Sequence, residues 1–398
     1  MPTPTASSAT PLVLFLHGSA VLYGSDKVLL NIVTALRAER ALQPVVVLQE
    51  DGPLSAAFAA AGVEVHVATV VKVQRAMLGP ALPITLLREL QRAVADLDRI
   101  AGGRQVRLVY SNTLAVLGGA FWAWRRGLPH LWHVHEMPSR PALVGWALPR
   151  VASWLSQAVI ANSTQTSLWL QKQAPALAGR TTVAFNGLGA APLAVSSAVQ
   201  AFRNRLGVAA TDVLVVLAGR INRMKGQDLL IEAASLLRET GMLGRLQFLI
   251  VGDTVPGDEA LRDALRSRAE TLGIGSRLRF LPFTEDIFGV WAAADIAVVP
   301  STEPEAFGLV AIEAMACGRP VVAAAHGGLL DVVEDGVTGV LIPPCNRKAL
   351  ADALVRLADD DGLRRRLGEA GARRQQRLFS LDAQVAAIGA VCASLVKR

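Results

Sequence analysis

The chain has 398 residues, of which 52% are hydrophobic and 18% charged, and its mean hydropathy is +0.38. This length favours two domains, and the apolar content excludes a disordered or collagen-like chain. Charges, prolines or glycines interrupt the apolar runs before the ~20 residues that a membrane-spanning helix needs. The formal charge is +7, and its excess lies in residues 1–200, with 16 Lys and Arg against 9 Asp and Glu, whereas residues 201–398 carry 24 of each.

The beginning of the chain and the cysteines bear on its compartment. Residues 1–10 lack the basic and apolar regions of a signal peptide, and we expect a disordered tail there. The three cysteines are odd in number and form no CxxC or CxxH pattern, which argues against a disulfide framework or a zinc site. The sequence therefore predicts a cytoplasmic protein.

The first half alternates short apolar runs with amphipathic segments. The run 12–17 (LVLFLH) predicts a buried strand, and a helix is expected from about Lys27, with Asp26 placed to cap it. Further strands are predicted at 44–49, 63–67, 106–110, 130–134 and 158–161. Such alternation is typical of a parallel sheet, so residues 11–190 are predicted to form one Rossmann-like domain.

The second half repeats this plan. Strands are predicted at 213–219, 246–252, 277–282, 296–301, 320–325 and 339–343. The small residues of 190–199 indicate an interdomain linker, placed at 191–205, before a domain of residues 206–380. Residues 381–398 are expected to form a terminal helix that packs back toward the first domain. The predicted fold class is α/β, with two doubly wound parallel sheets in tandem.

Three loops of the second half carry candidate chemistry, because ligands of open α/β sheets bind at the carboxyl ends of strands. Arg220 and Lys225, each beside a glycine, follow the strand 213–218 and suit a phosphate-bearing ligand. After the strand 296–301, Gly308 opens a helix whose N–H groups suit a diphosphate. His326-Gly327-Gly328 forms a flexible turn at the same end of the sheet.

The segment EAFGLVAIEAMACGRPVV resembles the E-x7-E signature of retaining glycosyltransferases of family 4, with Glu305 and Glu313 at the acidic positions. GRINRMKG is similar to the Gly-Arg…Lys-Gly segment of that family, and VGD, FLPF, AAADIAVVPS and EDGVTGVLIPP follow in its order and spacing. The resemblance is strong over 210–380 and looser before it. It implies a GT-B fold, in which two Rossmann-like domains face an interdomain cleft and the second holds most of the nucleotide sugar.

The resemblance also implies residue roles. Catalytic roles fall to His135, Arg220, Lys225 and Glu305, and contacts to the nucleotide sugar fall to Gly219, Phe307, Gly308, Leu309 and Glu313. Arg220 and Lys225 would neutralise the diphosphate leaving group, so no metal and no cofactor are expected. Asp96 and Asp98 make no convincing D-x-D metal motif, because side chains at i and i+2 diverge on a helix.

In such enzymes the first half supplies acceptor contacts, here expected from His17, Gly18, Tyr23, Gly24, Ser25, Asn112, Glu136 and Asn186. Ser25-Asp26-Lys27 departs from the family's usual Gly-Gly-Ala-Glu loop. His133 is expected to point to the opposite face of its strand from His135 and to serve packing. A structural role for His135, and turn or cap roles for Asn112 and Asn186, stay open.

Residues 101–200 contain eight basic residues, a single acid, Glu136, and six of the seven tryptophans: Trp122, Trp124, Trp132, Trp146, Trp154 and Trp169. This composition suits an anionic membrane surface and predicts peripheral attachment to the inner membrane face. Tryptophans in a core beside a solvated basic face explain it equally well. Nucleic acid is disfavoured, because no binding signature is present.

The predicted function is a retaining, metal-independent transfer of a sugar from a nucleotide-diphosphate donor to a glycan or lipid-linked acceptor, in cell-envelope or polysaccharide biosynthesis. Two alternatives stay open. One is an epimerase or phosphorylase of the same fold, and the other is a non-catalytic, membrane-associated protein that binds nucleotide sugars. A dehydrogenase is disfavoured because no strand is followed by G-x-G-x-x-G.

Overall fold

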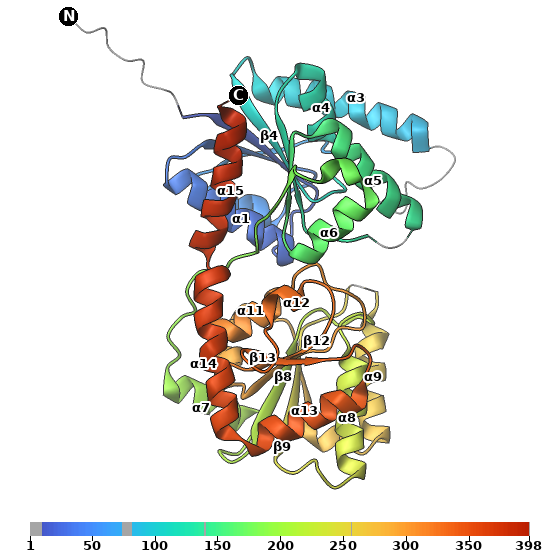
Figure 1. The fold of residues 1–398 in the computed structure, drawn as a ribbon, viewed down its shortest axis with the longest axis vertical. Coiled ribbons are helices and arrows are strands. Elements are labelled where there is room, and N and C mark those ends of the chain that lie inside the picture. The colour runs from blue at the N-terminus through green and yellow to red at the C-terminus, as the bar shows by residue number, and fades with distance from the viewer. Residues whose placement is uncertain (1–9, 74–81, 139–140, 256, 398) are drawn as a thin grey trace, which may run out of the picture. The chain divides into compact units, whose positions relative to one another are not determined.

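The computed structural model describes residues 10–73, 82–138, 141–255 and 257–397 (Figure 1). The tail predicted for residues 1–10 lies outside these ranges except for Thr10. The chain divides into two compact units: unit 1 is Met1–Gly187 with Leu381–Arg398, and unit 2 is Leu188–Ser380. Each unit is built on one parallel sheet, which confirms the predicted α/β class with two Rossmann-like domains.

The sheet of unit 1 has seven strands in the order β3-β2-β1-β4-β5-β6-β7. They are β1 Leu12–His17, β2 Gln43–Leu48, β3 Glu64–Val67, β4 Val106–Asn112, β5 His130–Val134, β6 Ala158–Ala161 and β7 Thr181–Val183. Strand β7 was not predicted, because its three residues form no apolar run. The order reverses between β1 and β4, whose register pairs His17 directly with Asn112.

The helices of unit 1 cover this sheet. They are α1 Gly24–Ala38, α2 Pro53–Ala60, α3 Leu82–Ala101, α4 Gly118–Arg126, α5 Ala142–Leu155, α6 Thr164–Gln173 and α15 Leu381–Val396, with a 3-10 turn at Pro175–Leu177. Helix α15 packs against α1 and β4, so the chain returns to unit 1 after completing unit 2 (Figure 1).

The sheet of unit 2 has six strands in the order β10-β9-β8-β11-β12-β13 and reverses between β8 and β11. They are β8 Val213–Ala218, β9 Leu246–Val251, β10 Leu278–Leu281, β11 Ile296–Val299, β12 Val321–Ala324 and β13 Gly339–Ile342. The helices are α7 Ser196–Arg205, α8 Gln227–Glu239, α9 Glu259–Thr271, α10 Ile287–Ala293, α11 Leu309–Ala316, α12 Leu329–Val332, α13 Arg347–Asp359 and α14 Asp361–Leu378, with a 3-10 turn at Gly275–Arg277.

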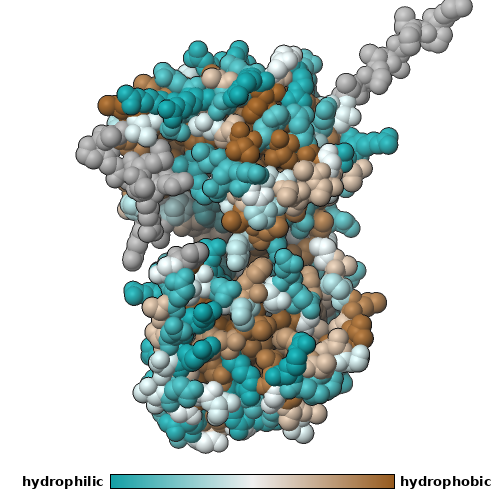
Figure 2. Space-filling model, turned by 180° about the vertical axis from the view of Figure 1, so that it is seen from behind, coloured by the Kyte–Doolittle hydropathy of each residue, from teal (hydrophilic) through white to brown (hydrophobic). Residues whose placement is uncertain are grey.

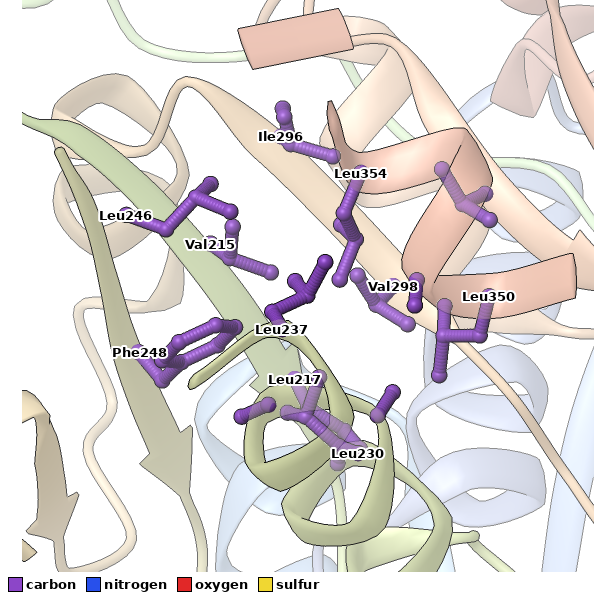
Figure 3. Close-up of a cluster of buried hydrophobic side chains, with 14 of the residues drawn as sticks. Val215, Leu217, Leu230, Leu237, Leu246, Phe248, Ile296, Val298, Leu350 and Leu354 are labelled. Carbon is purple, nitrogen blue, oxygen red and sulfur yellow. The ribbon is translucent and has the colours of Figure 1, made fainter. Parts of the chain in front are cut away.

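The core of unit 2 shows why its strands read as unbroken apolar runs. Figure 3 shows side chains of β8, β9 and β11 meeting those of α8 and α13, including Val215, Phe248, Val298, Leu237 and Leu354. Burying both faces of a parallel sheet favours continuous apolar strands.

On the face that Figure 2 presents, apolar patches are scattered among hydrophilic ones.

The linker predicted at 191–205 is wrong from residue 196 onward, where helix α7 begins. Helix α7 packs on α10, and the buried Arg203 donates to the Asp295 carboxylate at 2.8 Å and to the Ala293 carbonyl at 2.9 Å. The small residues at the start of this segment suggested a linker, but the ion pair that fixes the helix joins positions 92 residues apart.

Candidate functional site

In unit 2, two charged side chains meet where the strand order reverses. Lys225 follows β8 and Glu305 follows β11, and the Lys225 Nζ lies 2.8 Å from the Glu305 Oε1. Ligands of doubly wound sheets bind at this reversal, because the loops on its two sides diverge. The Lys225 side chain keeps 27% of its surface exposed and the Glu305 side chain 13%. The structure therefore brings together two of the four residues predicted to be catalytic.

The loop after β8 has a backbone that only glycine adopts easily. Gly219 has φ +142° and Gly226 has φ +76°, and a Cβ on Gly226 would lie 2.1 Å from the Pro300 carbonyl oxygen. Within the loop, the Asn222 Oδ1 accepts from the N–H groups of Met224 and Lys225 at 3.0 and 3.1 Å. This turn holds the backbone of Lys225, while Arg220 lies on the exposed surface.

The loop after β11 is held by Ser301, which the sequence did not single out, and by His326 of the predicted glycine turn. The buried Ser301 hydroxyl donates to the Glu305 carboxylate, and the His326 Nε2 donates to the Ser301 carbonyl at 2.8 Å. The Gly328 N–H donates to the Glu305 carbonyl at 2.7 Å, and a Cβ on Gly327 would lie 2.3 Å from that same oxygen. The predicted glycine turn therefore packs directly on the loop that carries Glu305.

Helix α11 begins beside this loop. Gly308 precedes it with φ +109°, and Leu309 is its first residue, so its first N–H groups lack intrahelical acceptors. The Phe307 ring is buried in an edge-to-face contact with Phe379, with ring centroids 5.7 Å apart, so only its backbone suits a ligand contact. Glu313 lies in the helix, and its Oε2 accepts from the Trp291 Nε1 at 3.4 Å.

In unit 1, the corresponding reversal lies between β1 and β4, and the groups there are buried. The His17 Nε2 lies 2.6 Å from the Asp26 Oδ1, and the Asn112 Nδ2 lies 3.0 Å from the His17 Nδ1. The His135 Nε2 lies 2.9 Å from the Asn112 Oδ1. Of the predicted acceptor contacts, His17 and Asn112 thus bond each other, and His17 keeps only 1% of its surface exposed.

The expected opposite orientation of His133 is wrong. Its ring packs against the His135 ring with centroids 3.9 Å apart, because residues two apart in an extended segment share a face. The Tyr110 hydroxyl lies 2.6 Å from the His133 Nδ1. Burial lowers the pKa of His133 to about 3 and the pKa of His135 well below its ordinary value, so both rings are neutral.

Glu136 stabilises the loop after β4. Its carboxylate accepts from the N–H groups of Leu114 at 2.6 Å and His135 at 3.1 Å. Burial raises the pKa of Glu136, although these bonds oppose that shift. The neighbouring Thr113 has φ +82°, a strained conformation for a β-branched residue, and such strain concentrates at functional sites.

The other predicted acceptor residues separate into exposed and buried groups. Helix α1 begins at Gly24, where Tyr23 and Gly24 are exposed and Ser25 is half-buried. Asp26 caps the helix from within its first turn by accepting from the Tyr23 N–H at 3.1 Å. The Gly18 carbonyl accepts from the Lys72 Nζ at 2.8 Å.

Asn186, by contrast, is buried. Its Oδ1 accepts from the Gln384 Nε2 at 3.3 Å, which ties it to α15.

The carboxylates of Asp96 and Asp98 accept hydrogen bonds from other residues of unit 1. Asp96 accepts from the Thr69 N–H at 3.1 Å, and Asp98 accepts from the Trp122 Nε1 at 2.8 Å. Within the described ranges, no group of three or more His, Cys, Asp or Glu side chains is arranged to hold a metal ion. In the same part of the chain, no helix is both long and apolar enough to cross a bilayer.

Both halves of the chain match family models. The model described as Glycosyltransferase Family 4 matches residues 22–190, and the model described as Glycosyl transferases group 1 matches residues 199–374. A D-inositol 3-phosphate glycosyltransferase of Geodermatophilus obscurus is 46% identical over 193 residues, which are 46% of this chain and 41% of the relative. One of Streptomyces bingchenggensis is 34% identical over 287 residues, 69% of this chain and 63% of the relative. The chain thus spans less than two thirds of each relative.

Solved structures align over nearly the whole chain. Anabaena Alr3699/HepE in complex with UDP is 28% identical with a TM-score of 0.82, covering 96% of this chain and 99% of that one. Its complex with UDP-glucose gives 28% identity and a TM-score of 0.80 over the same shares. Sucrose-phosphate synthase of Thermosynechococcus elongatus shares the fold, with 24% identity and a TM-score of 0.77 over 97% of this chain and 99% of its own.

Proposed function

Because the chain belongs to the family 4 and group 1 glycosyltransferases of the GT-B fold, we propose that it transfers a sugar from a nucleotide-diphosphate donor. One observation carries the proposal: the Lys225–Glu305 pair lies at the reversal of the unit 2 sheet, between glycine-bearing loops and the start of α11. A cation beside backbone N–H groups suits a diphosphate, and a carboxylate suits sugar hydroxyls. The complexes of Anabaena Alr3699/HepE with UDP and UDP-glucose support the same ligand class.

In this proposal Lys225 and Arg220 stabilise the charge that develops on the leaving diphosphate, which makes a metal ion unnecessary. Glu305 contacts the donor sugar and Glu313 the ribose. The transfer retains the anomeric configuration, and the leaving phosphate accepts the proton of the attacking hydroxyl. The E-x7-E spacing of the two glutamates supports this assignment.

Calorimetric titration with UDP, GDP and ADP in EDTA tests the binding of the nucleotide. We expect one nucleotide to bind without metal and Glu313→Ala to weaken that binding. Binding only after Mg²⁺ is added would contradict metal independence. Failure of all three to bind would contradict the transferase, whereas binding without turnover for any acceptor would favour the non-catalytic alternative.

Mass spectrometry of products then distinguishes the enzymatic alternatives. A transferase yields a larger glycosylated acceptor, whereas an epimerase yields an isomer of the nucleotide sugar without any acceptor. NMR of the product's anomeric proton tests retention. We propose a glycan or lipid-linked acceptor of envelope or polysaccharide biosynthesis, and the names of the curated relatives make D-inositol 3-phosphate a useful first acceptor.

A second observation favours attachment to an anionic membrane surface from the cytoplasmic side. Leu143, Trp146, Arg150 and Trp154 follow one another at intervals of three or four residues along α5 and therefore share one face. The three apolar side chains are exposed, Trp154 to 80%, and the Arg150 guanidinium lies 4.3 Å from the centroid of the Trp146 ring. Exposed indole rings beside cations suit the headgroup region of a bilayer.

Sedimentation with vesicles tests this attachment. We expect binding to phosphatidylglycerol vesicles at low salt, release at high salt through screening, and no binding to phosphatidylcholine vesicles. The double variant Trp146→Ser, Trp154→Ser should lose the binding, and Met242→Ser, an exposed apolar position of unit 2, should keep it. The absence of binding to anionic vesicles by the unaltered protein would remove the proposal.

A further inference from the structure

Helices α10 and α11 of unit 2 meet along a seam that includes two side-chain contacts. The Trp291 Nε1 donates to the Glu313 Oε2 at 3.4 Å, and the Cys317 Sγ lies 3.9 Å from the Phe288 carbonyl oxygen. Phe288 and Trp291 lie one turn apart on α10, and Glu313 and Cys317 lie one turn apart on α11 and its C-cap. Residues at these spacings share a face of a helix, so the seam joins one face of α10 to one face of α11.

Trp291 is fixed by its burial and by both ends of α10. Its side chain is completely buried. At the beginning of α10 the Asp286 carboxylate accepts from the Gly289 N–H at 2.9 Å, and at its end the Ala293 carbonyl accepts from Arg203 at 2.9 Å. The indole N–H therefore points in one direction, toward Glu313.

Glu313 lies where a ligand at the start of α11 would meet it. Leu309 is the first residue of the helix, and Glu313 follows one turn later, about 6 Å along the axis. Side chains on a helix lean toward its N-terminus, so the half-buried Glu313 leans back toward the N–H groups proposed to bind the diphosphate. The ribose of a nucleoside diphosphate is bonded directly to the diphosphate, which agrees with the proposed contact between Glu313 and the ribose.

The two groups of the Trp291–Glu313 contact have complementary requirements. An indole N–H only donates, and when it is buried it needs an acceptor. A half-buried carboxylate needs donors, because its lost contact with water costs free energy. An ionised carboxylate accepts up to about four hydrogen bonds, so a bond from the indole is compatible with further bonds from ribose hydroxyls.

We propose that Trp291 is a positioning residue, which orients the Glu313 carboxylate toward the ribose and so lets the site distinguish a ribonucleotide from its 2′-deoxy form. The inference rests on the proposed function for the position of the nucleotide. Two neighbouring ribose hydroxyls can both donate to one carboxylate only when that carboxylate is held in a suitable orientation. The buried indole supplies the orientation through its N–H, which a phenylalanine ring lacks.

Calorimetry with a matched pair of ligands tests this role. The pair is the nucleoside diphosphate that binds among UDP, GDP and ADP, and the same nucleotide without its 2′-hydroxyl: dUDP, dGDP or dADP. We expect the 2′-deoxy form to bind about tenfold more weakly to the unaltered protein and at most about threefold more weakly to Trp291→Phe, which loses the N–H but keeps an aromatic ring. If Trp291 served packing alone, the substitution would weaken both nucleotides by the same factor and overturn the proposal.

A double-mutant cycle assigns the effect to the contact. Glu313→Ala should lose the preference for the ribonucleotide, and adding Trp291→Phe should change the preference no further. Trp122→Phe is the matched control and should keep the preference, because the Trp122 Nε1 donates to a different carboxylate, that of Asp98 in unit 1, at 2.8 Å. Equal binding of the two nucleotides by the unaltered protein would also overturn the proposal.

The contact itself is measured without a ligand, in spectra of protein labelled with ¹⁵N at its seven tryptophans. The indole N–H signal that is missing from Trp291→Phe belongs to Trp291. Glu313→Ala should shift this signal and leave that of Trp122 in place, and an unmoved Trp291 signal would overturn the contact. Because these spectra need no nucleotide, failure of the contact and failure of all nucleotides to bind are separate results, and the second would overturn the proposed function together with the role at the ribose.

Discussion

The two units carry the same kind of sheet, yet the side chains at the point where the strand order reverses differ in their burial. In unit 1 the reversal between β1 and β4 is spanned by the His17–Asn112 contact, which lies in the interior. In unit 2 the reversal between β8 and β11 is spanned by the Lys225–Glu305 ion pair, which keeps part of its surface in solvent. The contrast is between a buried contact in unit 1 and a charged pair in unit 2 that stays partly accessible.

Desolvation accounts for this difference. Burying a charge is costly unless its partners compensate fully, so groups that exchange with solvent or with a charged ligand stay near the surface. Neutral imidazole and amide groups can be buried when nearly every donor and acceptor is matched, and they then specify one arrangement. The accessible pair of unit 2 can therefore exchange its partner for a charged ligand, whereas the buried contacts of unit 1 fix one arrangement of their side chains.

The largest expected effect comes from breaking the charged pair in unit 2. Lys225→Ala should reduce turnover about 10²–10³-fold, or ~3–4 kcal/mol, if the lysine stabilises the leaving diphosphate as an oxyanion-hole group does. Steady-state kinetics with the nucleotide sugar that binds in calorimetry measures this. Lys348→Ala is the control, because Lys348 forms an exposed pair with Asp352 on α13. Wild-type turnover by a folded Lys225→Ala variant would refute the role.

Two buried histidines of β5 make the stability of unit 1 sensitive to acid. Burial lowers the pKa of both His130 and His133 to about 3 from 6.5, so the stability that their neutral forms contribute is complete above pH 6.5. It is lost as the pH falls from 6.5 toward 3, because the unfolded chain binds protons that the folded chain excludes.

The expected loss is about 1.4 kcal/mol per pH unit for each histidine. Urea unfolding at several pH values, followed by tryptophan fluorescence, reports mainly on unit 1, which holds six of the seven tryptophans. A stability that does not change between pH 7 and pH 5 would be inconsistent with these buried neutral rings.

Unit 1 also depends on the helix that returns to it from the end of the chain. The Gln384 Oε1 accepts from the Gly187 N–H at 3.0 Å, and its Nε2 donates to Asn186. Gln384→Ala leaves these buried groups without partners and should cost about 1–3 kcal/mol of the free energy of unfolding. Fluorescence-monitored unfolding measures it, with the exposed Gln200→Ala in unit 2 as the control. Equal stability of the two variants would show that the hydrogen bonds of Gln384 contribute nothing to the free energy of unfolding.

The smallest effect concerns the turn that holds Lys225. Asn222→Ala removes the acceptor of the Met224 and Lys225 N–H groups and should weaken nucleotide binding by about 1 kcal/mol, or roughly fivefold. Calorimetry measures this change, and Asn204→Ala on α7 serves as the control. If Asn222→Ala binds as tightly as the unaltered protein, the turn does not position the lysine.

The sequence by itself determined the sheet-and-helix order and the residues of the unit 2 loops. Its apolar runs mark strands because both faces of each sheet are buried, and its glycines mark turns with a positive φ, as at Gly219, Gly226 and Gly308. The loop residues stand out because cations and carboxylates beside such glycines have few structural uses. Strand β7 and helix α7 were missed because their short or small-residue segments carry no periodic signal.

Only the tertiary structure decided which of these residues meet. His17 and Asn112 are 95 positions apart, and Lys225 and Glu305 are 80 apart, and each pair is joined by the order of strands within its sheet. Local periodicity contains no information about that order. It also does not show that the polar residues at the ends of those strands, His17 and Asn112, are interior groups, while Tyr23 and Gly24 at the start of α1 stay exposed. The chemistry of the residues is local, whereas their pairing and their protonation come from packing between distant segments.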